Sequence, residues 1–191
     1  MLPLILASAS PRREFLLREM GLTFTVVRPE NVEELTGGLM PEILATHNAQ
    51  RKARAVAAWH PHALVLGADT IVVLDGVVYG KPTDRDAAAR MLSTLAGRAH
   101  EVFTGVCLAT RGDRDFCFCE RTKVWMQALS AEQIRAYHAQ VNPLDKAGAY
   151  GAQEFGATII ERIDGSFSNV MGLPVERLRQ VLEQRAAASS S

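Results

Sequence analysis

Residues 64–73 constrain the fold of this chain more than any other stretch of its sequence. They are almost continuously apolar and rich in β-branched side chains, and Asp75-Gly76 follows as a two-residue hairpin signal. Such a run is typical of a strand that is covered on both faces of its sheet. The chain therefore needs further structure on both sides of a sheet, and 191 residues are enough to supply it within one domain.

Strand and helix patterns alternate on either side of this segment. The other predicted strands cover residues 4–7, 102–110, 116–127 and 158–163. The predicted helices begin after Ser10, at Pro41, after a Thr83/Asp86 capping box, after a Ser130/Gln133 cap and at Pro174. The first, second, third and last of them end near Gly21, Trp59, Gly97 and Arg185. The predicted buried faces of the first two helices include Phe15, Leu16, Leu17, Met20, Ile43, Leu44, Ala53, Val56 and Ala57.

Strands and helices thus alternate without full βαβ regularity, which favours an α/β fold around a mixed sheet. No internal repeat or linker interrupts the pattern. We expect one domain over residues 1–185 and a disordered tail over residues 186–191.

The composition argues against several classes of partner. With 21 basic and 21 acidic residues the chain has no net field to recruit nucleic acid or a membrane surface. No apolar stretch approaches the ~18 residues of a membrane span, and no basic segment precedes the short apolar N-terminal run. Cys107, Cys117 and Cys119 lack a second zinc-ligand group at a plausible spacing, so we expect free thiols and a cytoplasmic location.

The sequence SASPRR at residues 8–13 lies where the first strand gives way to the first helix. Arg12 and Arg13 in the first helical turn oppose the helix dipole, so without a partner they cost stability. A bound anion would make the two arginines stabilising instead, because backbone N–H groups, the Ser8 and Ser10 hydroxyls and both guanidiniums would point at it. The segment alone fits either an anion site or a solvated arginine pair.

Asp69 interrupts the apolar segment within GADTIVV, residues 67–73. A carboxylate near a buried strand is costly unless a cation or several donors compensate it. The residue is therefore either a turn residue that caps its neighbours or a metal ligand or general base at the mouth of the sheet. Thr70 beside it would supply a hydroxyl group.

Two lysines are ambiguous in the same way. Gly80-Lys81-Pro82 imitates part of a phosphate-binding P-loop, but the spacing is one residue short and Pro82 prevents the helix start that the motif needs. Lys81 either reaches a phosphate or is solvated. Lys52, within the second predicted helix, allows the same two interpretations.

The segment DKAGAYGAQ at residues 145–153 combines small residues with one aromatic residue in a polar setting. Gly148 and Gly151 either let the backbone approach a ligand closely or serve a tight turn. The Gln153 amide can both donate and accept toward the edge of a planar base.

In order along the chain, these segments resemble the Maf family of nucleotide pyrophosphatases over nearly everything from Leu6 to Leu178. The resemblance rests on LASASPRR (6–13), VEE (32–34), RKARAVA (51–57), GADTIVV (67–73), GKP (80–82), AGRAHEVFTGV (96–106), DKAGAYGAQ (145–153) and IDGSFSNVMGLP (163–174). It implies a mixed, strongly twisted sheet flanked by helices, similar to the inosine triphosphate pyrophosphatase fold. It also implies a homodimeric hydrolase that cleaves nucleoside triphosphates to the monophosphate and pyrophosphate with magnesium or manganese.

The resemblance also implies roles for individual residues. Asp69 corresponds to the catalytic proton acceptor and, with Glu34, to the acidic residues that hold the metal; Glu33 is an alternative to Glu34 one residue away. The phosphate-contacting positions are matched by Ser8, Arg12, Arg13, Lys52 and Lys81. The positions that distinguish substrates are matched by Arg12, Thr70 and Gln153.

Within the family, Lys146, Tyr150 and Gln153 match the branch that resembles dTTP and UTP pyrophosphatases. Glu154-Phe155 departs from that branch, in which many members have glycine next. The alternatives are a 7-methyl-GTP pyrophosphatase and a non-catalytic nucleotide-binding regulator of cell division, since the family is also described in connection with inhibition of septum formation. The presence of Asp69, Glu34 and both arginines argues against a non-catalytic protein.

Overall fold

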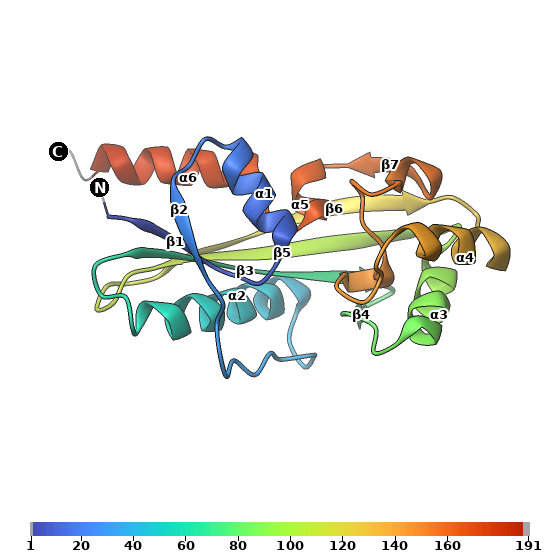
Figure 1. Ribbon diagram of the computed structural model, residues 1–191, viewed down its shortest axis with the longest axis horizontal. Helices are drawn as coiled ribbons and strands as arrows, with labels where there is room; N and C mark the ends of the chain where they lie inside the picture. Colours follow the sequence, from blue (N-terminus) through green and yellow to red (C-terminus); the bar gives the residue numbers. More distant parts are fainter. Residues whose placement is uncertain (1, 189–191) are drawn as a thin grey trace.

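The long apolar segment forms strand β3 (Leu64–Leu74) of a seven-stranded sheet in a computed structural model that describes residues 2–188 (Figure 1). The strand order is β2-β1-β3-β5-β6-β7, with β4 also paired to β3. The other strands are β1 (Leu4–Ala7), β2 (Phe24–Val27), β4 (Val77–Tyr79), β5 (Ala99–Ala109), β6 (Phe116–Met126) and β7 (Ile160–Asp164). β1 is parallel to β2 and β3, and the remaining pairs are antiparallel. The predicted mixed α/β fold is confirmed.

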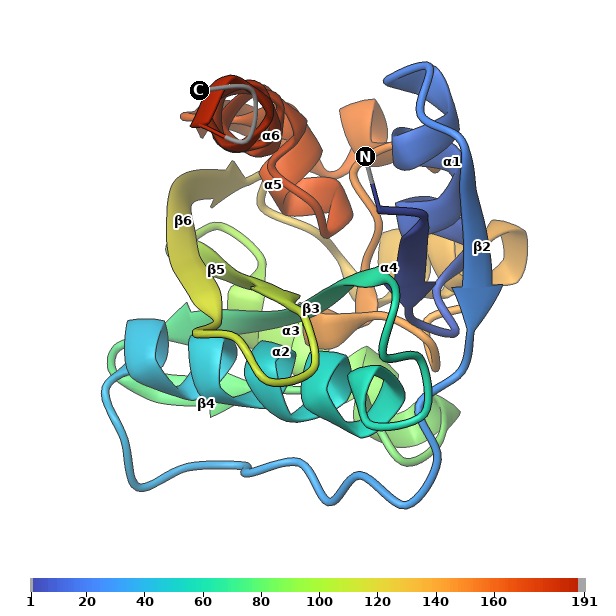
Figure 2. The ribbon, with the colours of Figure 1, turned by 90° about the vertical axis from the view of Figure 1, so that its left-hand side faces the viewer.

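Helices cover both faces of this sheet. They are α1 (Pro11–Glu19), α2 (Pro41–Ala57), α3 (Arg85–Leu95), α4 (Ala131–Gln140), α5 (Phe167–Met171) and α6 (Val175–Ala188), with 3-10 turns η1 (Ala147–Ala149) and η2 (Gly156–Thr158). α2 lies on one face, and α5 and α6 lie on the other (Figure 2). Successive side chains of a strand point to opposite faces, so Val65 packs on α2 while Leu66 packs against α1 and α6.

Helix α2 contacts the sheet through its backbone as well as its side chains. Ala45, Ala49 and Ala53 follow one another at four-residue spacing on the buried side of the helix. Opposite them stand Gly67 of β3 and Gly105 of β5, where a Cβ atom would overlap backbone atoms of Ala49 and Ala45. Small residues on both sides therefore let α2 pack unusually close to the sheet. Long side chains of α2 can then reach groups on β3.

One edge of β3 is open along part of its length. β1 pairs with residues 64–67 and β4 with residues 72–74 of that edge, while β5 pairs with the opposite edge (Figure 1). Within residues 2–188, no strand pairs with this edge at residues 68–71. Asp69 and Thr70 therefore lie in a gap between β1 and β4.

Buried histidine and tyrosine side chains hold the segment between α4 and β7 against β5 and against α4. His100 Nε2 lies 2.7 Å from the hydroxyl of Tyr150, and His138 Nε2 lies 3.0 Å from the carbonyl oxygen of Ala149. The Tyr137 hydroxyl donates to the carbonyl oxygen of Gly151. Burial lowers the pKa of His100 from 6.5 to about 4.

Several predictions about local structure need correction. Asp84, not Thr83, caps α3, because its side chain accepts from the amide of Ala87. Phe15 and Ile43 were predicted to face the core but are 54% and 52% exposed, since the narrow buried stripes of α1 and α2 pass beside them. β7 begins at Ile160, two residues later than predicted, because η2 occupies the preceding turn.

At the C-terminus, α6 continues to Ala188 rather than ending near Arg185. Residues 186–188 are therefore helical and not part of a disordered tail, which fits the high helix propensity of alanine. The predicted tail residues 189–191 lie outside the described residues. Neither β2 nor the short helix α5 was predicted.

The predicted hairpin is confirmed. Asp75 and Gly76 both have positive φ, as a type I′ hairpin turn requires. The three cysteines are free. No helix in the described part of the chain combines the length and apolar character needed to cross a membrane.

Gly67→Ala tests the close approach of α2. The added Cβ would overlap the Ala49 carbonyl and push the helix off the sheet, so we expect a loss of about 3 kcal/mol, the upper end for overpacking. Urea unfolding measures this loss. Gly37→Ala is the control, because a Cβ there meets nothing within 4 Å. Equal stability of the two variants would contradict the packing argument.

His100→Gln tests the pH dependence that the buried histidine creates. The unfolded chain takes up a proton near pH 6.5 and the folded chain only near pH 4, so stability is full above pH 6.5 and falls as the pH drops toward 4. This accounts for about 2 kcal/mol lost between pH 7 and pH 5. We expect urea unfolding to show a smaller loss for His100→Gln, and an unchanged loss for the exposed-residue control His62→Gln. The same loss in both variants would show that another group titrates.

Candidate active site

Asp69 stands in the middle of β3, beside the open edge of the sheet. The sequence-based alternatives were a turn or the mouth of the sheet, and the structure contradicts the turn. The residue is 6% exposed. Asp69 points toward α2, whereas its neighbour Thr70 points to the opposite face, toward α1 and α5. Groups from both layers can therefore meet at the gap.

On the α2 side, Asp69 belongs to a cluster in which two carboxylates share one ammonium group. Asp69 and Lys52 are buried, and Glu34 is about half exposed. Lys52 Nζ lies 2.6 Å from Asp69 Oδ1 and 2.8 Å from Glu34 Oε1. Asn48 Nδ2 donates to Asp69 Oδ2 at 3.2 Å. Asn48 and Lys52 lie one turn apart on α2, so the helix presents both donors to the same carboxylate.

Asn48 also fixes the segment that carries Glu34. Its side chain accepts from the amide and donates to the carbonyl of Leu35, both at 2.9 Å. Glu34 is thereby held at the cluster although its side chain is 49% exposed. Glu33 is exposed as well, but among residues 2–188 the ion pair of Lys52 is with Glu34 and not with Glu33. Burial alone raises the pKa of Glu34, but Lys52, Lys81 and Arg13 outweigh it, and the net pKa is lowered.

This arrangement suits a small divalent cation. Two carboxylates from different segments contact the ammonium group of Lys52. A positive charge therefore already lies between them, where a cation could bind. Magnesium prefers hard oxygen ligands and commonly takes one or two carboxylates, with waters and substrate phosphates completing its shell. No cluster of three or more metal-ligating His, Cys, Asp or Glu side chains occurs among residues 2–188. The Asp69 and Glu34 carboxylates could hold a metal only together with waters or phosphate oxygens.

On the opposite face, Arg13 reaches the gap from α1. Its Nε donates to the Gly172 carbonyl at 2.8 Å, and its Nη2 donates to Thr70 Oγ1 at 2.9 Å. Nη1 lies 3.4 Å from Ser8 Oγ, at the end of β1. Thr104 of β5 is 3.0 Å from the Thr70 hydroxyl and completes this polar contact.

Arg13 connects the two halves of the site electrostatically. Burial lowers the pKa of Arg13, with Arg12 acting in the same direction and Asp69 and Glu34 opposing it. All four side chains are therefore close enough to interact. The N-terminus of α1 adds to the positive field, since within the described chain the Ser10 side chain makes no capping hydrogen bond there.

Arg12 points instead toward the segment that begins at Asp145. Its guanidinium donates to Asp145 Oδ2 at 2.8 Å and to the Asp145 carbonyl at 3.0 Å. Lys146 Nζ lies 2.9 Å from Asp145 and 3.0 Å from Glu154. Gln153 Nε2 donates to Glu154 at 3.0 Å. A continuous chain of charged contacts thus links α1 to Gln153.

Lys81 is exposed on the loop that follows β4. That loop is tied to the Asp145 segment, because the Gly148 amide donates to the Gly80 carbonyl at 3.1 Å. Its charge helps lower the pKa of Glu34.

The structure brings Asp69, Glu34 and Lys52 into direct contact, with Lys52 between the two acids. Ser8, Arg13 and Thr70 meet on the opposite face of β3. Arg12 connects to Gln153 only through intervening charged residues, and Lys81 lies on the neighbouring loop. Residues that the sequence argument missed are Asn48, Thr104, Asp145 and Gly172. Helical spacing could have found Asn48, four residues before Lys52. Thr104 and Gly172 carry no local signal, because only strand pairing and the α5 turn bring them to Thr70.

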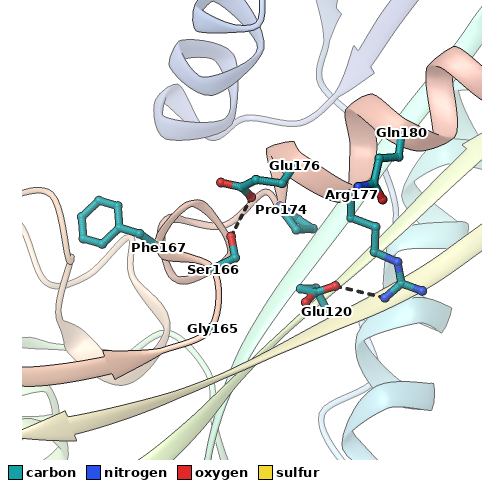
Figure 3. A pocket seen from close by; sticks show the side chains of 8 residues that line it. All are labelled: Glu120, Gly165, Ser166, Phe167, Pro174, Glu176, Arg177 and Gln180. Atoms are coloured by element: carbon teal, nitrogen blue, oxygen red, sulfur yellow. Dashed lines mark hydrogen bonds and ion pairs between the residues drawn. The ribbon is translucent and has the colours of Figure 1, made fainter.

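A hollow of about 490 Å³ lies elsewhere, between β6, the turn before α5 and α6 (Figure 3). Arg177 forms an ion pair with Glu120, and Glu176 accepts from the hydroxyl of Ser166. The lining therefore holds two carboxylates and one guanidinium and is net negative, unlike the cationic surroundings of Asp69.

The chain is similar to known proteins over nearly its whole length. A model of the Maf-like protein family matches residues 3–185. The dTTP/UTP pyrophosphatase of Symbiobacterium thermophilum is 51% identical over 181 residues, which are 95% of this chain and 93% of that protein. The dTTP/UTP pyrophosphatase of Moorella thermoacetica is 48% identical over 182 residues, covering 94% of this chain and 93% of that protein.

Solved structures share the fold at low sequence identity. The Staphylococcus aureus Ham1 protein superposes with a TM-score of 0.54 at 13% identity, covering 96% of this chain and 99% of that chain. A HAM1 protein from Coxiella burnetii gives a TM-score of 0.52 at 18% identity, covering 96% and 100%. These likenesses confirm the predicted fold class.

Proposed function

The chain belongs to the family of Maf-like proteins, and we propose that it is a nucleoside triphosphate pyrophosphatase that converts dTTP and UTP to the monophosphate and pyrophosphate. The observation that carries this proposal is the gap beside β3, where a buried carboxylate meets a second carboxylate and cations from both faces. The pyrimidine preference is supported by the names of the relatives and by Gln153, which can address a base edge.

The triphosphate would bind where positive charge is concentrated. Arg12 and Arg13 extend from the first turn of α1, Lys81 lies on the opposite loop, and Ser8 adds a hydroxyl at the end of β1. Phosphate oxygens would compete with Asp145 for the guanidinium of Arg12. Preorganised donors of this kind stabilise the charge that builds up as pyrophosphate leaves.

Asp69 would accept the proton of the attacking water. Lys52 and Asn48 each hold one of its oxygens, which fixes the carboxylate plane while lone pairs remain for water. Positioning of this kind supplies most of the rate in phosphoryl transfer. Lys52 would also keep Asp69 and Glu34 from repelling each other before substrate binds.

Asp69 and Glu34 would hold a divalent cation, magnesium or manganese. The chemistry that such a cation supplies when bound is neutralisation of phosphate charge and a more acidic water. Lys52, at 2.6 and 2.8 Å from the two carboxylates, would have to shift toward the phosphates as the cation enters.

Base selection would rest on Gln153, with Arg12 and Thr70 shaping the surroundings. Pairing of buried polar edges separates substrates strongly, whereas one methyl group changes binding by only ~1–3 kcal/mol. dTTP and UTP should therefore be close competitors.

We further propose a homodimer, a cytoplasmic location and a single domain over residues 1–185.

A panel of triphosphates tests the function. Purified protein with magnesium or manganese should release pyrophosphate and the monophosphate from dTTP and UTP, with both products identified by chromatography. Release of inorganic phosphate instead, or preference for 7-methyl-GTP, would contradict the proposal.

In the same assay, Asp69→Asn should lower kcat by at least ~10²-fold, because the proton acceptor is lost. The variant should remain folded by circular dichroism, although Lys52 keeps only Glu34 as a partner. Asp164→Asn, at the exposed end of β7, is the matched control and should leave kcat unchanged. A folded Asp69→Asn protein with full activity would remove Asp69 from the mechanism.

Arg12→Ala tests the phosphate site without turnover. Pyrophosphate at 100 times its Kd stabilises a protein by ~2.7 kcal/mol through mass action, and this gain should shrink in the variant. Arg18→Ala on the same helix, whose exposed side chain pairs with Glu14, should keep the full gain. Thermal unfolding with and without pyrophosphate measures both. An undiminished gain in Arg12→Ala would place the anion elsewhere.

A further inference from the structure

In the carboxamide of Gln153, the nitrogen donates a hydrogen bond, and the oxygen accepts none from the described residues. Its Nε2 donates to Glu154 Oε1 at 3.0 Å. Its Oε1 is buried, and within residues 2–188 no donor reaches it. A buried acceptor without a donor is costly, so this oxygen is poised to accept a hydrogen bond from a ligand.

Glu154 decides which end of the amide remains unengaged. A carboxylate accepts hydrogen bonds and cannot donate them, so it attracts the NH2 group and repels the amide oxygen. If the amide flipped, its oxygen would face the Glu154 carboxylate and its NH2 would face the ligand. The contact at 3.0 Å therefore selects one of two amide orientations that are otherwise nearly equivalent in shape.

Glu154 is itself held in place. Its other oxygen, Oε2, lies 3.0 Å from Nζ of Lys146, a residue only 3% exposed. Lys146 is anchored in turn by Asp145 at 2.9 Å and by the Asn142 carbonyl at 2.7 Å. With both oxygens engaged, the carboxylate cannot rotate away from Gln153 without breaking an ion pair.

The absence of a side chain at Gly151 leaves room for Lys146 and Gln153. A Cβ at Gly151 would lie 2.8 Å from Cε of Lys146 and 3.6 Å from Oε1 of Gln153. The lysine stem and the amide oxygen therefore both approach the Gly151 backbone. Phe155, two residues after Gln153, is exposed.

We propose that Glu154 is a specificity-determining positioning residue, which fixes the Gln153 carboxamide so that it presents an acceptor to the base. This inference rests on the proposed function. Uracil and thymine carry an N3–H donor that matches such an acceptor, whereas cytosine has a bare N3 acceptor at that position. Glu154 thereby favours UTP and dTTP over CTP, although it does not contact the base itself.

Glu154→Gln tests this role, because glutamine keeps the size of the side chain but can either donate to or accept from Gln153. The measurement is the ratio of kcat/KM for UTP to that for CTP. We expect the ratio to fall at least tenfold relative to wild type. Glu161→Gln on the exposed side of β7 should keep the wild-type ratio. A purely structural role would slow both nucleotides together, and an unchanged ratio in Glu154→Gln would overturn the proposal.

Binding of UMP and CMP, measured by calorimetry, separates this inference from the proposed activity. Wild type should bind UMP more tightly than CMP, and Glu154→Gln should lose most of that difference even if no turnover occurs. Failure of turnover with this binding pattern would refute the pyrophosphatase and retain the role of Glu154. Equal binding of UMP and CMP by wild type, or no binding of either, would overturn the role. If Glu154→Gln does not fold, Glu154→Ala replaces it with the same expected loss of ratio.

Discussion

The close contact between α2 and the sheet is the constraint on which the site depends. Gly67 and Gly105 on the strands and three alanines on the helix let the two backbones approach each other. At this separation, Asn48 and Lys52 of α2 reach the carboxylate of Asp69, which would otherwise be buried without compensation. A larger residue at either glycine would move these donors away and leave a costly buried charge.

The second organising feature is the interrupted edge of β3. Because β1 stops after four residues and β4 begins further along, a central strand of the sheet keeps a free edge beside Asp69 and Thr70. Alternation of side chains then directs the acid toward α2 and the hydroxyl toward α1. A site with an acidic half and a basic half can thus form across a single strand, which suits a substrate that needs both a proton acceptor and phosphate-binding cations.

Charged contacts connect the proposed phosphate-binding residues to the residue proposed to contact the base. Asp145 holds Arg12, Lys146 joins Asp145 to Glu154, and Glu154 holds Gln153. The guanidinium that would contact phosphate and the amide that would contact the base therefore share one network. If a phosphate took the place of Asp145 as the ion-pair partner of Arg12, the charges around Lys146 would change. Glu154, at which the sequence departs from the branch that it resembles, therefore belongs to the same network of contacts as Arg12.

Local rules in the sequence determined the long apolar strand, the type I′ turn at Asp75-Gly76 and the capping box at Ser130, because each depends on residues close in the chain. The ordered motifs also indicated the family and the set of candidate site residues. Tertiary structure alone decided that Asp69 lies beside an open edge of the sheet and that Lys52 stands between two acids. It alone also pairs Arg12 with Asp145, 133 positions away. The reason is physical: strand pairing, helix-to-sheet distance and the selection among ion-pair partners arise from segments that meet only when the chain is folded.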